Sequence, residues 1–567
     1  GVGNGYWYGP LSYWGSKASS LVTTSSSNIS IAVDRFDWAG GTNPYFATTG
    51  TVEVKPASTS FGMTTYSAWF VINQNSQTVS GFTLGKSGNT AALDVGSAIT
   101  ANGPINLYGG DVSISQSMTS TATGADILVK ATGNITSTGD LTHSTNGGDI
   151  TFWSDADGSG GGYVYIQDRN IIDTRTTANR NSALISTATG GGSITLGGGT
   201  ASTTLASGTV VPTGYAADNT SSVPGGVTLG YFNAGHDSGL KFYSGGGDIT
   251  LRGKSTTVWN GDTSGIAALE GLTMDAGASG NITFDGVGGP SGSTYTSGIF
   301  LGYWGSNGNA STLLKTNNGN ISLTGVGTGG TNNRGIIFCC TASKPVTLAA
   351  TGTGSVSLTG TGSTYDFIFS GANNILAASG AITLTGTTSG GPLKADTSVT
   401  TLGYKSGTLV TSSSSDITIT DNSMSLAAGN GVQVNTSGKL TIQPYGDNFT
   451  SITYPITDFA VSSDVTGLTI GKDLGTTAHT DTVTIGGATS ISGPINVYAG
   501  TINLNANLNT SGGGAAGNVL LKSSGAITQA SNVSVTTNGG DVTYWADSDG
   551  ANGGYAWFKS GASVNTT

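Results

Sequence analysis

The chain has 567 residues, of which 94 are glycine, 36% are hydrophobic and only 9% are charged, and its formal net charge is −11. An apolar content this high with so few charges excludes a typical disordered chain, and the 12 prolines are too few for collagen. The negative net charge, without any cluster of Lys or Arg, argues against nucleic acid and anionic membrane surfaces as partners.

Short predicted strands follow one another along the whole chain. Each begins with Gly and a small residue, followed by an aliphatic residue, Ser or Thr, and a second apolar residue. This alternation predicts strands with an apolar inner face and a hydroxyl-bearing outer face, each opened by a turn residue. Examples in chain order are GDITF (148–152), GSITL (192–196), GDITL (247–251), GNITF (280–284), GNISL (319–323), GSVSL (354–358) and GAITL (380–384). No segment has sustained helical periodicity, so we expect an all-β fold.

Long phrases of the sequence return about 390 residues later. LVTTSSSNISI (21–31) returns as LVTSSSSDITI (409–419), and GPINLYGGDVSI (103–114) as GPINVYAGTINL (493–504). TNGGDITFWSDADGSGGGYVYI (145–166) returns as TNGGDVTYWADSDGANGGYAWF (537–558). The offset is 388 (409 − 21) at first and 392 (537 − 145) at the end. We expect residues 1–567 to form one continuous segment of a longer repeat array, with a first copy at 1–390 and a partial second copy at 391–567.

A parallel β-helix, or β-solenoid, explains these features together. Stacked strands would align columns of Ile, Val and Leu inside, while Gly, Asn and Asp occupy the corners. An array of β-sandwich domains is the alternative, but sandwich arrays usually repeat about every 100 residues. The strong period here is several times longer, which favours the solenoid.

The GPIN(L/V)Y(G/A)G and NGGD(I/V)T(F/Y)W phrases and the GGY close resemble the giant β-strand-repeat proteins related to filamentous haemagglutinins. The resemblance implies a right-handed parallel β-helix in a large bacterial exoprotein, exported to the cell surface and used for adhesion or as a surface fibre. The sharpest matches cover residues 103–166 and 493–558, and the family's export domain is not recognisable. We therefore expect an extracellular or cell-surface location.

An Asp-x-Asp-Gly turn occurs in both long phrases. Asp155 and Asp157 are matched by Asp547 and Asp549, and such a turn is similar to the start of a calcium loop. The distal Glu of an EF-hand and the nonapeptide pattern of calcium-binding β-rolls are both missing. These four residues are calcium candidates, and a metal-free corner is the favoured interpretation.

Aromatic residues next to Gly form a second group of candidates. They could contact glycans or a neighbouring chain, or they could pack within the fold. At the repeat offset Tyr13 meets Tyr404 but Trp14 meets Lys405, which favours packing or partner contact over a ligand site needed in every copy. The candidates are Tyr6, Trp7, Tyr13, Trp14, Tyr231, Tyr303, Trp304 and Tyr404.

The sequence offers little for catalysis. His143, His236 and His479 are isolated, and at the repeat offset His143 falls near 533–535, so it is not a repeated feature. A polysaccharide-active β-helix enzyme is suggested by the fold class alone. We expect no enzymatic activity, no catalytic residue and no cofactor. Cys339 and Cys340 are adjacent, and since a bond between neighbours is strained, we expect two unpaired strand residues.

The favoured function is thus structural. We expect a stiff segment of a surface rod, fibre or sheath, with adhesion as the biological role. The expected partners are further chains of the same assembly, through lateral or end-to-end association, and no part of this segment should enter a membrane. A glycan-binding adhesin module is the alternative, with glycans as partners.

Overall fold

The computed structural model forms two compact units. Unit 1 comprises residues 1–319 with 329–331, and unit 2 comprises 320–328 with 332–567. The structure describes residues 5–7, 13–15, 24–38, 44–73, 76–167, 169–180, 188–230, 239–260, 262–269, 271–302, 311–339, 344–387, 391–551 and 553–567.

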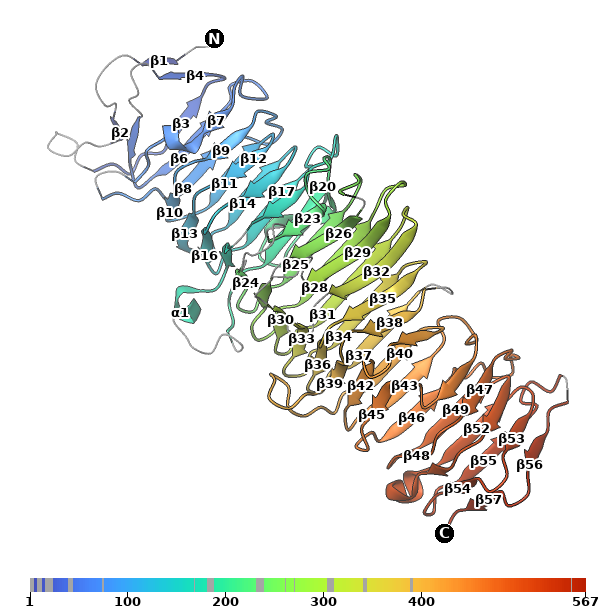
Figure 1. Ribbon diagram of the computed structural model, residues 1–567. Coiled ribbons are helices and arrows are strands. Elements are labelled where there is room, and N and C mark those ends of the chain that lie inside the picture. Colours follow the sequence, from blue (N-terminus) through green and yellow to red (C-terminus); the bar gives the residue numbers. More distant parts are fainter. Residues whose placement is uncertain are drawn as a thin grey trace. The chain divides into compact units, whose positions relative to one another are not determined.

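Unit 1 contains three parallel sheets that the chain visits in turn (Figure 1). The first sheet contains β3 (Ile29–Ala32), β6 (Thr51–Lys55), β8 (Gly81–Leu84), β11 (Ile105–Gly109), β14 (Ile127–Ala131), β17 (Ile150–Ser154), β20 (Ile194–Thr204), β25 (Ile249–Lys254) and β28 (Ile282–Gly288). The second contains β7 (Thr65–Tyr66), β9 (Leu93–Val95), β12 (Val112–Ile114), β15 (Ile135–Ser137), β18 (Val164–Ile166), β23 (Gly225–Leu229), β26 (Asp262–Leu269) and β29 (Tyr295–Gly302). The third contains β10 (Ile99–Ala101), β13 (Met118–Thr123), β16 (Thr142–Asn146), β19 (Ile171–Asp173), β24 (Leu240–Tyr243), β27 (Leu272–Asp275) and β30 (Thr312–Thr316).

A few further elements complete unit 1. β1 (Gly5–Trp7) pairs with β4 (Phe36–Trp38), and β2 (Tyr13–Gly15) pairs with β5 (Tyr45–Ala47). β21 (Val210–Gly214) folds back on β20 as an antiparallel hairpin, and β22 (Ala216–Ala217) pairs with β25. The helical elements among the described residues of this unit are α1 (Thr177–Arg180) and a 3-10 turn at Ser67–Trp69.

Unit 2 follows the same plan with five parallel sheets. Its first sheet contains β31 (Ile321–Gly327), β34 (Val356–Thr361), β37 (Ile382–Gly386), β40 (Ile417–Thr420), β43 (Lys439–Gln443), β46 (Gly467–Ile470), β49 (Ile495–Ala499), β52 (Val519–Ser523) and β55 (Val542–Trp545). The second contains β32 (Asn332–Cys339), β35 (Tyr365–Ser370), β38 (Leu393–Asp396) and β41 (Met424–Leu426), and the third β33 (Val346–Ala350), β36 (Asn374–Ala377), β39 (Thr400–Gly403), β42 (Val432–Asn435) and β45 (Phe459–Val461). The fourth contains β44 (Ile452–Tyr454), β47 (Thr482–Ile485), β50 (Thr501–Leu504), β53 (Ile527–Gln529) and β56 (Ala556–Phe558), and the fifth β48 (Thr489–Ser490), β51 (Leu508–Asn509), β54 (Ser534–Thr536) and β57 (Ser563–Asn565). A 3-10 turn covers Ser511–Ala516.

The strand pairing confirms a parallel β-helix and rules out the sandwich alternative. In the sheets of both units each strand pairs in parallel with the strand about one coil later, as Ile105 does with Ile127 and Ile127 with Ile150. Sandwich sheets are antiparallel. Within the described residues, the β20–β21 hairpin is the one antiparallel pair of strands.

The inner residues of the recurring formula build the core. Ile194, Ile249 and Ile282 are aligned on successive coils, and each is fully buried. The intervening Thr residues face outward and are buried less completely in β25 and β28. Apolar columns of this kind supply the burial that holds each coil to the next.

The first two residues of the formula have separate tasks between coils. A Cβ on Gly247 would lie 2.3 Å from the carbonyl oxygen of Gly192, so only Gly allows this close stacking. The following Asp or Asn accepts a backbone hydrogen bond from the next coil, as Asp248 Oδ1 does from Asn281 N at 2.8 Å. The formula is therefore a stacking device as well as a strand signal.

The returning phrases occupy equivalent strands in the two units. The phrase at 145–166 forms β17 and β18, and the phrase at 537–558 forms β55 and β56. Their turns match in detail, because Asp155 and Asp547 have φ values of 47° and 56°, and Gly158 and Gly550 have 68° and 67°. The sequence repeat is thus also a repeat of backbone conformation.

Candidate functional site

The two Asp-x-Asp-Gly turns hold their carboxylates in similar ways. Asp157 Oδ1 accepts a hydrogen bond from Ser159 N at 3.1 Å, and Asp549 Oδ1 accepts one from Ala551 N at 3.2 Å. Oδ1 of Asp155 and Oδ1 of Asp547 are buried and accept no hydrogen bond in the structure. Among the described residues, no group of three or more His, Cys, Asp or Glu side chains is arranged to hold a metal ion.

The surroundings of the first turn shift the pKa of Asp155 in two opposite directions. Burial raises the pKa of Asp155, and the neighbouring Asp157 carboxylate raises it further. The backbone N–H groups of Ser159 and Gly161 oppose this shift by donating toward the Asp155 carboxylate. The turn therefore has its own donors for one carboxylate, and calcium binding stays an untested hypothesis.

Four of the aromatic candidates lie on the short strands β1 and β2. Tyr6 and Trp7 lie on β1, and Tyr13 and Trp14 on β2, but only the backbone pairing of these strands is described. Tyr231, Tyr303 and Trp304 lie outside the described residues.

Tyr404 is the aromatic candidate whose side chain can be placed. It is half-buried and packs against a cluster formed by Ala349, Leu376 and Val410. Its hydroxyl donates to Asp464 Oδ2 at 3.4 Å. These contacts hold Tyr404 within unit 2, in a role of packing rather than of an open stacking platform.

His143 lies in the core rather than in a site. It is fully buried, its Nε2 lies 3.0 Å from Ser137 Oγ, and Ser137 donates to Asn170 Oδ1 at 2.9 Å. Burial lowers the pKa of His143 to about 4, so the ring is neutral at physiological pH. Full burial of all three side chains leaves no room for a substrate. For Cys339, the expectation of a free thiol is wrong, because it is disulfide-bonded.

The last coil of unit 2 exposes a set of large apolar side chains that the sequence analysis did not single out. In the described part of the chain, β55 pairs with β52, β56 with β53 and β57 with β54, and each of the three is the last strand of its sheet in chain order. Their exposed side chains, together with Tyr555 before β56, are Trp545, Tyr555, Trp557, Phe558 and Val564.

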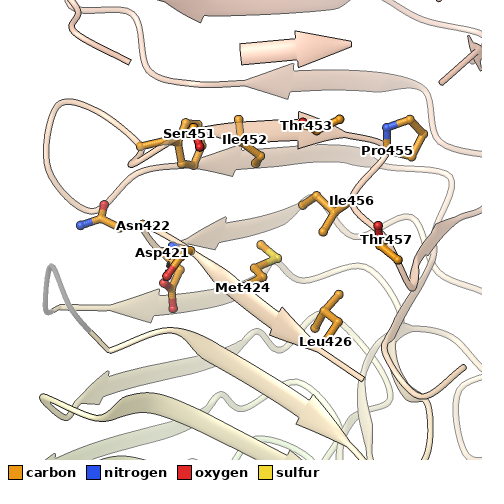
Figure 2. A pocket seen from close by; sticks show the side chains of 12 residues that line it. Asp421, Asn422, Met424, Leu426, Ser451, Ile452, Thr453, Pro455, Ile456 and Thr457 are labelled. Atoms are coloured by element: carbon orange, nitrogen blue, oxygen red, sulfur yellow. Dashed lines mark hydrogen bonds between the residues drawn. The ribbon is translucent and has the colours of Figure 1, made fainter. Parts of the chain in front are cut away.

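A cavity of about 310 Å³ opens within unit 2 between β41 and β44. Figure 2 shows Met424 and Leu426 of β41 on one side and Ile452 and Thr453 of β44 on the other. β41 ends the second sheet and β44 begins the fourth, and the two strands do not pair. The cavity is in the size range of small-ligand sites.

A pair of buried carboxylates lies at one end of this cavity. Asp421, which lines it, is 2% exposed, and Asp366 is fully buried. Oδ2 of Asp366 and Oδ2 of Asp421 lie 2.5 and 2.8 Å from the position that a Cβ on Gly386 would take, so the two oxygens are at most 5.3 Å apart, the sum of these distances. Burial and the Asp366 charge raise the pKa of Asp421 to about 8.

A signal in the sequence could have found this pair. The strands ISLTG (321–325), VSLTG (356–360) and ITLTG (382–386) end in Gly, whereas ITITD (417–421) ends in Asp. A Cβ on Gly325 or Gly360 would contact the backbone of the facing strand, as Gly360 would contact Asp366 O at 2.2 Å, whereas at Gly386 it would contact the two carboxylates. A carboxylate in place of Gly marks a coil where the interior has opened.

Comparison with known proteins gives no relative: no protein-family model, curated protein or solved structure matches the chain. In the described part of the chain, no helix has the length and hydropathy needed to span a bilayer.

Proposed function

We propose that the chain is a structural segment of a bacterial surface protein, a stiff β-solenoid whose coils stack on further coils of the same repeat. Its mechanism is mechanical: uniform backbone ladders make a spacer or fibre, and adhesion is the biological role of the assembly. The low charge and the outward Thr side chains fit an exported protein whose neighbours approach closely. End-to-end or lateral association with like chains is part of this proposal.

One observation carries the stacking proposal. Trp153 and Trp545 occupy the same position of the repeat, but Trp153 is 4% exposed and Trp545 is 47% exposed. The same holds for Ile166 at 0% and its counterpart Phe558 at 47%. β20 pairs with β17 and β23 with β18, whereas within the described residues β55 pairs with β52 alone and β56 with β53 alone. The exposed set is thus the surface that a following coil covers in unit 1.

Extension of the chain with its own repeat tests this proposal. Residue 567 corresponds to residue 175 (567 − 392), so residues 176–288 are fused after Thr567, and the control fusion carries the same residues in shuffled order. We expect the backbone amides of β55 and β56 to gain protection from hydrogen exchange only in the ordered fusion, because new strands pair with them. Equal exchange in the two fusions would overturn the stacking proposal.

The glycan-binding alternative predicts saccharide binding by the exposed aromatic side chains, measurable on a glycan array with the 567-residue chain. Of their counterparts in unit 1, Trp153, Tyr165 and Ile166 are buried by stacking and Tyr163 is half-buried, which favours coil contact over sugar contact. A polysaccharide-active enzyme would need accessible carboxylates, and Asp366 in the closest pair described above is fully buried.

A further inference from the structure

We propose that the groove between β41 and β44 binds an extended peptide as an added parallel strand, with alternating apolar side chains and a Lys or Arg beside Asp421. The surface protein would thereby hold a second polypeptide at a defined coil. This inference is independent of the stacking of whole coils, because it concerns a gap inside unit 2.

The first argument is that two strand edges face the same gap. On the flanks of the gap, β40 pairs with β43 and β42 pairs with β45, so the two coils are in direct contact there. Between these flanks, and within the described residues, β41 pairs only with β38 and β44 only with β47. An unpaired strand edge presents N–H and C=O groups, and addition of a strand is the usual way for a peptide to satisfy them.

The second argument is that the gap exposes side chains that belong to the core. Met424 continues the column of Phe367 and Leu393, which are both fully buried, yet Met424 is only half-buried. On the other side Ile452 continues the column of Val483, which is fully buried, and Ile452 is again half-buried. An added strand with apolar residues at alternate positions would complete both columns.

The third argument is the charge at one end of the groove. Oδ2 of Asp421 is buried without a hydrogen-bond partner, and the Asp366 carboxylate lies behind it. None of the residues that line the cavity is basic. No basic residue of the cavity lining stabilises the ionised form of Asp421, and a Lys or Arg side chain of the peptide would supply the missing cation, with Asp421 releasing its proton to solvent when the peptide binds.

The register of the peptide follows from the neighbouring strands. Every strand that pairs with β38 or β47 runs parallel to it, so the added strand runs parallel to β41. Asp421 precedes Met424 by three residues, so the basic residue precedes the first inward apolar residue by three. The sequence Lys-Ser-Thr-Ile-Thr-Leu has this pattern.

The test uses the 567-residue chain and a Lys-Ser-Thr-Ile-Thr-Leu amide that carries fluorescein on its N-terminal α-amine, with fluorescence polarisation as the readout. A peptide with norleucine in place of Lys, and one with Pro in place of the second Thr, are the ligand controls. We expect saturable binding of the first peptide, at least about tenfold weaker binding of the other two, and slower hydrogen exchange in β41 and β44 when it is bound.

Matched variants assign the binding to the groove. Met424→Gln places a polar group in the inward column and should weaken binding at least about tenfold, whereas Ser425→Gln, on the exposed face of the same strand, should leave it unchanged. Asp421→Asn should abolish the preference for Lys over norleucine, and Asp447→Asn, an exposed carboxylate nearby, should preserve it. Absence of binding at millimolar peptide, or equal binding by the Met424 and Ser425 variants, would overturn the proposal.

Discussion

The ammonium nitrogen of Lys130 lies 3.5 Å from the ring centroid of Trp153, and the equivalent pair, Lys522 and Trp545, lies at 4.6 Å. In each pair the Lys lies on the preceding coil and is the register partner of the Trp. A cation above an aromatic ring is attracted to the ring face. The repeat therefore preserves a contact between coils as well as the strands themselves.

Replacement of Lys130 tests the energy of this contact. Lys130→Met keeps the length of the side chain but removes the charge, and we expect a loss of about 0.5 to 2 kcal/mol in the free energy of unfolding. Urea denaturation measures it, with Lys254→Met, on the exposed end of β25, as the control. An equal shift of the urea midpoint in both variants would mean that the ring contributes nothing.

Glycine in the strand formula is predicted to be irreplaceable where coils touch. A Cβ on Gly438 would lie 2.1 Å from Ser415 O, whereas a Cβ on Gly446 would meet nothing within 4 Å. We expect Gly438→Ala to lower the free energy of unfolding by about 1 to 3 kcal/mol. Gly446→Ala should change it by less than about 0.5 kcal/mol. Thermal melting of the two variants side by side distinguishes a steric clash between coils from a general effect of glycine loss.

Strand type and inner face could be predicted from the sequence because every formula strand alternates in the same way. Coil length could not, since aligned positions are separated by 23 residues from Ile127 to Ile150 but by 55 from Ile194 to Ile249. Insertions such as the β20–β21 hairpin cause this spread and hide the short period.

The groove between β41 and β44 was also beyond the sequence analysis. It depends on two strands that do not pair, and no local pattern reports a missing partner. The signal that was present, Asp421 at a position held by Gly in earlier coils, becomes informative only once the strand register is known. In contrast, the turn of Asp155 was found directly because it occurs twice.

Removal of calcium is expected to leave the protein unchanged. The backbone N–H groups of Ser159 and Gly161 lower the pKa of Asp155 against the effect of burial, so the turn itself partly stabilises this carboxylate without a metal. The melting temperature should be the same in EGTA and in millimolar calcium. A rise with calcium that Asp155→Asn reduces would contradict this and would establish the turn as a cation site.

His143 is expected to make unit 1 sensitive to acid. Its pKa is lowered from 6.5 to about 4 by burial, so between these values the unfolded chain binds a proton that the folded chain does not. Stability from this residue should therefore fall as the pH is lowered from about 6.5 to about 4. His143→Val, which copies Val535 of the second phrase, should reduce the difference between the melting temperatures at pH 4.5 and pH 7.5. An unchanged difference would show that other groups control the acid response.

Asp421 is expected to make unit 2 less stable as the pH rises, which is the opposite of the pH dependence expected from His143 in unit 1. Burial and the Asp366 charge raise its pKa from 3.8 to about 8, so between these values the folded chain holds a proton that the unfolded chain has released. The stability that this proton provides is fully present below about pH 4 and is lost as the pH rises toward about 8, by up to about 1.4 kcal/mol for each pH unit.

Asp421→Asn tests this dependence, because the amide is neutral at every pH and has nearly the shape of the protonated acid. At pH 5 the variant and the unmodified chain should melt at similar temperatures. At pH 9 the variant should melt at a higher temperature than the unmodified chain. Asp366→Asn should also raise the melting temperature at pH 9, since it removes the charge that opposes ionisation of Asp421. If the unmodified chain and Asp421→Asn respond equally to pH, Asp421 ionises at an ordinary pKa and the end of the groove is open to solvent.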